Sequence, residues 1–154
     1  MTCVAMSSRG SDPRWVDRIL DWRGTWLLAR IGLTSAFLLG GLTKLLDFAA
    51  AVAEQDHFGL HPAWVWACLA IMVELGGSLL IIIGRWIWLS AGAIGVLTAI
   101  ATYVASPFWR MTGHTRFLAI NTFFEHVGLI AGCVMAALLA EHARRPDAPA
   151  RPTA

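Results

Sequence analysis

The amino-acid sequence predicts an all-α integral membrane protein, a four-transmembrane-helix bundle preceded by an amphipathic interfacial helix. Hydrophobic residues make up 57% of the chain and charged residues only 14%, and the mean hydropathy is +0.62. A soluble globular domain typically carries about 25% charged residues, so this chain is too apolar for that class. The apolar residues also form long runs, and the eight tryptophans lie in the N-terminal amphipathic segment or at or just past the ends of those runs. No stretch contains enough basic and aromatic residues together to suggest nucleic-acid binding. The expected partner is the lipid bilayer.

Residues 1–25 predict a cytoplasmic N-terminal segment with an amphipathic helix over residues 13–24. Residues 1–10 lack the apolar core of a cleavable signal peptide. Asp12 as N-cap and Pro13 as the first helical residue give a helix start. The apolar side carries Trp15, Ile19, Trp22 and Trp26, and the polar side carries Arg14, Asp17, Arg18 and Asp21. We expect this helix to lie on the inner membrane surface. The alternative is a polar leader that packs on nothing.

Four apolar runs predict the spans of a transmembrane domain over residues 26–140. They cover residues 26–46, 62–84, 86–105 and 117–140. The second run would be about 34 Å long as a helix, enough to cross a hydrocarbon core of about 30 Å. Each of the other runs is also of transmembrane length.

The connections between the spans differ in length. Residues 47–61 are mixed and polar and form a first loop in which a short helix can form. Arg85 alone separates the second span from the third, so that turn must be tight. Pro107 breaks the helix at the start of the loop over residues 106–116. The Pro- and Arg-rich residues 141–154 predict a disordered cytoplasmic tail.

The distribution of basic residues predicts that both termini are cytoplasmic. Eight arginines would lie on the side of the termini: 9, 14, 18, 23, 85, 144, 145 and 151. Lys44, Arg110 and Arg116 would lie on the other side. An excess of Lys and Arg marks the cytoplasmic side of a membrane protein.

Glu74 interrupts the second span near its middle. A charged group at that depth costs several kcal/mol, roughly 3 on insertion scales, so the carboxyl group must be neutral, paired or turned into the bundle. On the fourth span Asn121, Glu125, Gly128 and Gly132 share one helical face, and we expect this face to look into the bundle. Close packing of the helices by itself accounts for the glycines.

The ionisable groups predict a meeting place in the outer half of the bundle. We expect Glu74, Glu125, His126, Asn121 and Lys44 to bound a polar cavity there. Arg30, one turn inside the first span, is a further candidate for ligand binding. The alternative is structural, with Lys44 reaching the interface and pairing with Asp47 or Glu125.

The histidines and cysteines give no metal or thiol motif. His57, His61 and His114 have spacings that match no metal site, and we interpret them as surface residues. Cys68 and Cys133 would differ in depth by about 15 Å, too far for a disulfide. No metal site is expected.

Several stretches together resemble the DoxX family of small bacterial four-helix membrane proteins. They are ARIGLTSAFLLGGLTKLLDF at 29–48, HPAWVWACLAIMVELGGSLLIIIG at 61–84, ATYVASPFW at 101–109 and NTFFEHVGLIAG at 121–132. The family pattern maps onto Arg30, Gly41, Lys44, Glu74, Gly76, Gly77, Phe123, Phe124, Gly128 and Gly132. The VELGGSLLIIIG segment is the most specific part of the match.

The resemblance implies a multi-pass protein of the bacterial inner membrane that is associated with quinone-linked redox chemistry. The leading hypothesis is a redox subunit whose cavity binds a quinone headgroup and whose electrons come from a partner subunit. A second hypothesis is a non-catalytic membrane subunit or assembly factor, and a third is a small-solute carrier. The sequence leaves open the enzymatic activity and the oligomeric state, including a homo-oligomer.

Overall fold

The structure, a computed structural model, describes residues 13–144. Over this range the chain is helical and contains no strand. Four segments within the range are long and apolar enough to cross a membrane: Gly24–Leu46, Ala63–Ile83, Ile87–Arg110 and Gly113–Arg144. The predicted fold class, an all-α membrane protein with four transmembrane helices, is therefore confirmed.

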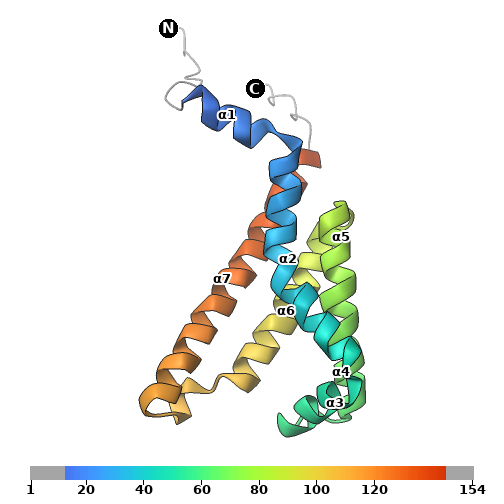
Figure 1. Ribbon diagram of the computed structural model, residues 1–154, viewed down its shortest axis with the longest axis vertical. Helices are drawn as coiled ribbons and strands as arrows, with labels where there is room; N and C mark the ends of the chain where they lie inside the picture. Colours follow the sequence, from blue (N-terminus) through green and yellow to red (C-terminus); the bar gives the residue numbers. More distant parts are fainter. Residues whose placement is uncertain (1–12, 145–154) are drawn as a thin grey trace, which may run out of the picture.

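The elements follow one another with short connections (Figure 1). In chain order they are α1 (Arg14–Asp21), α2 (Arg23–Leu46), α3 (Phe48–His57), α4 (Ala63–Ile71), the π-helical turn η1 (Met72–Gly76), α5 (Gly77–Ile83), α6 (Ile87–Ala105), the 3₁₀ turn η2 (Phe108–Arg110) and α7 (Gly113–Arg144). The segments α4, η1 and α5 together form the second span.

The N-terminal helix α1 is shorter than the range 13–24 predicted for it. It begins after Pro13 and ends at Asp21, because Trp22 has an extended backbone with φ −70° and ψ 124°. Pro13 therefore precedes the helix instead of being its first residue, and Asp12 lies outside the described residues. The Thr25 hydroxyl donates to the carbonyl of Ile19 across the break. In Figure 1 α1 bends away from the axis of α2, and Trp15 and Ile19 are exposed.

The turn between α5 and α6 is tight, as Arg85 alone between two apolar runs predicted. Gly84 has a φ of 84°, a left-handed conformation that glycine adopts without strain. The amides of Gly84 and Arg85 each donate to the carbonyl of Leu80 at 3.0 Å, which closes the last turn of α5. Trp86, with φ 49°, completes the turn.

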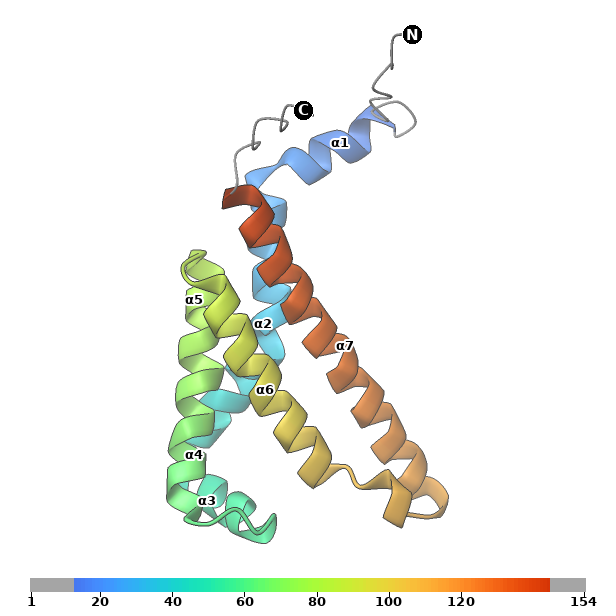
Figure 2. The same cartoon turned by 180° about the vertical axis from the view of Figure 1, so that it is seen from behind.

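Helix α3 forms within the predicted first loop. The Asp47 carboxylate accepts a hydrogen bond of 3.0 Å from the Ala50 amide, so Asp47 caps the helix. Helix α3 packs on α4 and buries Ala51 and Gln55, at the end of the bundle opposite α1 (Figures 1 and 2).

Helix α7 is longer than the predicted span of residues 117–140. It begins at Gly113, which has a φ of 65°, and continues to Arg144. Residues 141–144 of the predicted tail are therefore helical, because the first helix-breaking residue after Ala140 is Pro146. The remainder of that tail lies outside the described residues.

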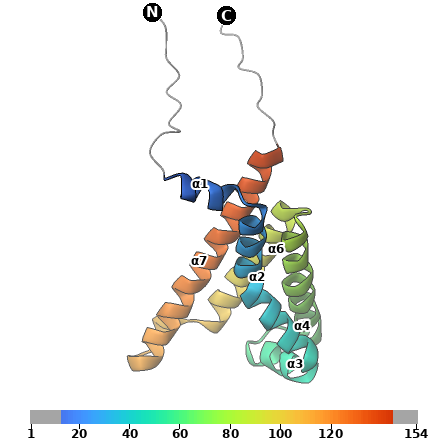
Figure 3. The same cartoon turned by 45° about the horizontal axis from the view of Figure 1, so that its top comes forward.

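The apolar core lies between α5, α6 and α7. Its buried members include Ile81, Ile94 and Cys133, against which Leu33 and Phe37 of α2 also pack. The last part of α7 lies beside the start of α2, and the two helices diverge toward the start of α7, in all three views (Figures 1, 2 and 3). In that opposite half α2 packs on η1 instead.

Candidate functional site

Lys44 and Glu74 form an ion pair in the interior of the bundle. The Lys44 ammonium nitrogen lies 3.0 Å from Glu74 Oε1 and 3.1 Å from Oε2. The side chains of Lys44 and Glu74 are 21% and 14% exposed, so neighbouring protein atoms cover most of the pair. An isolated charge at this depth would be costly, and each group supplies the counter-charge that the other needs.

Two consecutive glycines of α2 allow the pair to form. A Cβ added at Gly41 would lie 2.8 Å from Leu75 Cγ, and one added at Gly40 would lie 3.3 Å from Glu74 Oε2. These distances show that the α2 backbone touches the η1 segment, which carries Glu74. Single π-helical turns inside α-helices occur frequently at functional sites, so the local backbone marks Glu74 independently of its charge.

A cavity of about 200 Å³ adjoins the ion pair. Its polar lining comes from α2, α3, the second span and α7, and consists of Lys44, Glu54, Gln55, Glu74 and His126. Most of its remaining wall is apolar and comes from α4 and α6, including Trp66, Leu97 and Ile100. The arrangement places a few polar groups in a mainly apolar hollow, which is typical of small-molecule sites.

His126 is held by a hydrogen-bond chain on α6. The Thr102 hydroxyl lies 2.7 Å from His126 Nδ1 and donates its proton to the carbonyl of Thr98 at 2.6 Å. When the hydroxyl donates to that carbonyl, Thr102 accepts from His126 and the ring carries its proton on Nδ1; the other tautomer requires the hydroxyl to donate to the ring. With its proton on Nδ1, the neutral ring has Nε2 as its acceptor.

The polar face of α7 does not look into the bundle, and that prediction is wrong. Asn121, Glu125 and Gly128 are exposed on the helix surface, and a Cβ added at Gly128 would meet no atom within 4 Å. Only Gly132 of the set packs inward, against Leu33. Helix α7 instead packs on α6, so the neighbouring face that carries His126 and Cys133 points inward.

The structure thus brings together some of the predicted site residues and separates others. Lys44, Glu74 and His126 line one cavity, whereas Asn121 and Glu125 do not. Arg30 lies toward the end of the bundle that carries the termini, where a Cβ added at Gly84 would be 2.8 Å from its Nη1 atom. A ligand-binding role for each of these residues stays a prediction.

Glu54 and Gln55 line the cavity and Thr102 contacts His126, but the sequence predicted none of the three as a site residue. Glu54 and Gln55 belong to a segment that reads only as a polar loop, and they reach the cavity because α3 folds back over it. Thr102 stands at helical spacing from Thr98, which was the available signal for a polar stripe.

The described cysteines and acidic residues show no metal or disulfide arrangement. Cys68 and Cys133 are free thiols. Residues 13–144 contain no group of three or more His, Cys, Asp or Glu side chains that could hold a metal ion.

Comparisons with known proteins identify the family. The DoxX family model matches residues 25–107, more than half of the chain, from α2 through α6. The inner membrane protein YphA of Escherichia coli K12 is 22% identical over 112 residues, which cover 73% of this chain and 80% of that protein. No solved structure matches significantly. Lys44 and Glu74 lie inside the family match and His126 lies outside it. The chain belongs to the DoxX family.

Proposed function

We propose that this protein is an inner-membrane subunit of a quinone-linked redox system, and that the cavity beside Lys44 and Glu74 binds a quinone headgroup. The observation that supports this most strongly is the cavity itself, which gathers an ion pair from two spans and a histidine from a third. The name of the Escherichia coli relative supports the inner-membrane location.

The polar groups have the chemistry that a quinone ring requires. An ammonium group has three protons, and two contacts to Glu74 leave Lys44 with a donor for a quinone carbonyl. Reduction of a quinone to a quinol takes up two protons together with two electrons. Glu74 and His126 are the groups of the cavity that can donate protons to the ring or accept them from it. The proposal assigns the electron donor to a partner subunit.

The proposal also includes the orientation of the chain. Residues 1–25 and 141–154 would lie in the cytoplasm, on either side of a transmembrane domain over residues 26–140. The cavity would then occupy the outer half of the bundle, with α3 on the outer side. The excess of arginines in the terminal segments and in the turn at Arg85 supports this orientation.

Ligand titration tests the headgroup site. The purified full chain is titrated with a short-chain ubiquinone or menaquinone analogue, in parallel with Glu74→Gln and His126→Leu. Each variant should weaken binding at least about tenfold, because a hydrogen bond to a charged or ring group in a dry site is worth roughly 1.5–3 kcal/mol.

Glu125→Gln is the matched control, because Glu125 is a span carboxylate that does not line the cavity. Its affinity should equal that of the wild type. Undetectable binding by the wild type would overturn the quinone proposal and favour the second function, a structural membrane subunit. The mutual neutralisation of Lys44 and Glu74 is the observation that supports that second function.

A further inference from the structure

We propose that an apolar groove between the second span and α6 holds the hydrocarbon tail of a quinone whose headgroup occupies the cavity. This inference rests on the proposed function and identifies the ligand as a long-tailed quinone that enters sideways from the lipid. A quinone of the membrane pool is an amphiphile, so a site for its ring needs an apolar path for its chain.

The groove has the size and lining that a hydrocarbon chain requires. Its volume is about 420 Å³ and its lining side chains are all apolar or glycine, among them Leu69, Val73 and Ala93. Along α6 it extends from Trp88 to Ile100. The twelve helical steps between these two residues correspond to about 18 Å, more than half of the hydrocarbon thickness of about 30 Å.

The groove and the cavity meet at three side chains. Trp66, Leu97 and Ile100 line both hollows. A ligand can therefore place its polar ring beside Glu74 and its tail against Val73 without leaving the protein surface. This continuity is the observation that carries the inference.

Trp66 stands at the junction and differs from the other tryptophans. All eight lie within the described residues, and the seven others are 46–63% exposed. Trp66 is partly buried, and it lines both the cavity and the groove. A tryptophan placed for interfacial anchoring would remain exposed, so its position points to a role at this junction.

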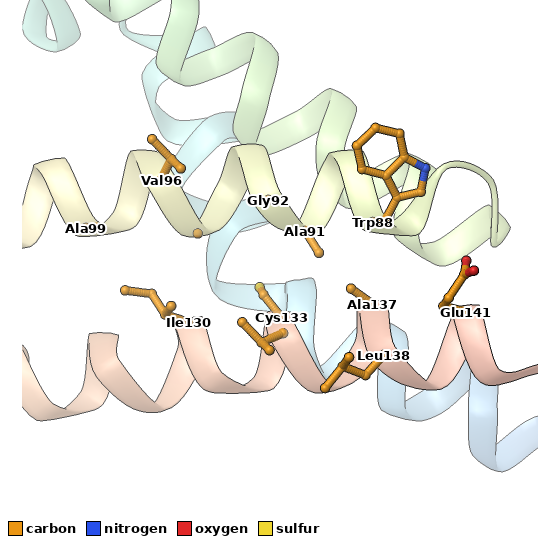
Figure 4. Close-up of a pocket in the computed structure, with 12 residues that line it drawn as sticks. Trp88, Ala91, Gly92, Val96, Ala99, Ile130, Cys133, Ala137, Leu138 and Glu141 are labelled. Carbon is orange, nitrogen blue, oxygen red and sulfur yellow. The ribbon is translucent and has the colours of Figure 1, made fainter.

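A second groove lies between α6 and α7 (Figure 4). It is larger, with a volume of about 800 Å³, and it is lined by residues such as Ala99, Ile130 and Cys133. It shares no lining residue with the cavity. A tail in that groove would have no headgroup site beside it, so the continuity and not the size selects the first groove.

Photolabelling in lipid nanodiscs tests the tail position. The full chain is incubated with a quinone analogue that carries a diazirine in its tail, irradiated and digested, and the labelled peptides are identified by mass spectrometry. Label is expected on the peptides of the second span and α6 that contain Leu69, Val73 and Ala93. Excess tailless analogue should displace it, because both compounds compete for the cavity.

Two alanine variants of α6 provide a matched pair. Ala93 lines only the groove beside the second span and Ala99 lines only the groove beside α7. Ala93→Leu should reduce labelling at least fivefold, and Ala99→Leu should leave it unchanged. Both variants should bind the tailless analogue like the wild type, which also shows that they are folded.

The outcomes separate the two proposals. Failure of the wild type to bind the tailless analogue overturns both. Binding of that analogue together with label on α7 peptides, or with label that it does not displace, overturns the tail groove and leaves the headgroup site standing. Label that the tailless analogue does not displace would mean that ordinary lipid chains occupy the groove.

Discussion

Glu74 and Glu125 are both carboxylates within transmembrane helices, but they have different surroundings. Glu74 binds Lys44 through both oxygens in the bundle interior, whereas Glu125 is exposed on α7. Removing one partner of a largely buried pair leaves the other charge without compensation, which costs more than the pair itself contributes. The two positions should therefore respond differently to the same substitution.

Glu74→Leu should lower the free energy of unfolding by about 3 kcal/mol, because Lys44 then remains unpaired in the interior. The double variant Lys44→Met with Glu74→Leu should recover most of the loss, since both charges are gone. Reversible unfolding in mixed micelles measures these differences. Equal losses in the single and double variants would contradict the argument, and Glu125→Leu, expected within about 0.5 kcal/mol of the wild type, is the control.

At the scale of the elements, the contact between α2 and η1 determines the geometry of the site. Gly40 and Gly41 bring the α2 backbone against the π-helical turn, which carries Glu74 and Leu75. The contact brings the C-terminal turn of α2 close enough to η1 for the Lys44 ammonium group to reach the Glu74 carboxylate. Small residues at such crossings are the usual way in which membrane helices approach closely.

Gly41→Ala should destabilise the protein by about 1–3 kcal/mol, because the added methyl group overlaps Leu75. Gly128→Ala is the matched control, since a Cβ at Gly128 meets no atom within 4 Å. The control should be neutral or stabilise by up to about 1 kcal/mol, because alanine favours the helix. Thermal unfolding of the two variants measures the difference, and equal effects would show that the α2–η1 contact is loose.

At the scale of the whole molecule, the two ends of the bundle differ in charge and in structure. The end of the termini carries α1, the turn at Arg85 and the last turn of α7 (Figure 3). The opposite end carries α3 and η2. In the sequence, eight of the twelve basic residues belong to segments 1–25 and 141–154 or are Arg85, which favours a cytoplasmic location for the first end.

Alkaline phosphatase, which is active only in the periplasm, tests this orientation. A fusion after Ala154 should be inactive, and an insertion of the same enzyme at Met111, between η2 and α7, should be active. Activity after Ala154 with none at Met111 would reverse the orientation and would place the cavity in the cytoplasmic half of the membrane.

The fold was largely predictable because its strongest determinants are local in the sequence. Apolar runs of transmembrane length identify the spans, Arg85 between two such runs requires a tight turn, and the glycine at position 84 permits it. The ends of the helices were predicted less accurately than their existence. Thus α7 continues to Arg144 because no helix breaker precedes Pro146.

The sequence by itself determined the class of the protein and its spans, and it identified Glu74 as a carboxylate inside an apolar run. A carboxylate in an apolar run is conspicuous wherever the run packs. Only the tertiary structure decided which side chains meet Glu74. Helical periodicity shows which residues share a face, but the neighbour of that face depends on how α7 packs on α6 and how α3 folds back. For that reason His126, Glu54 and Gln55 line the cavity while Asn121 and Glu125 face outward.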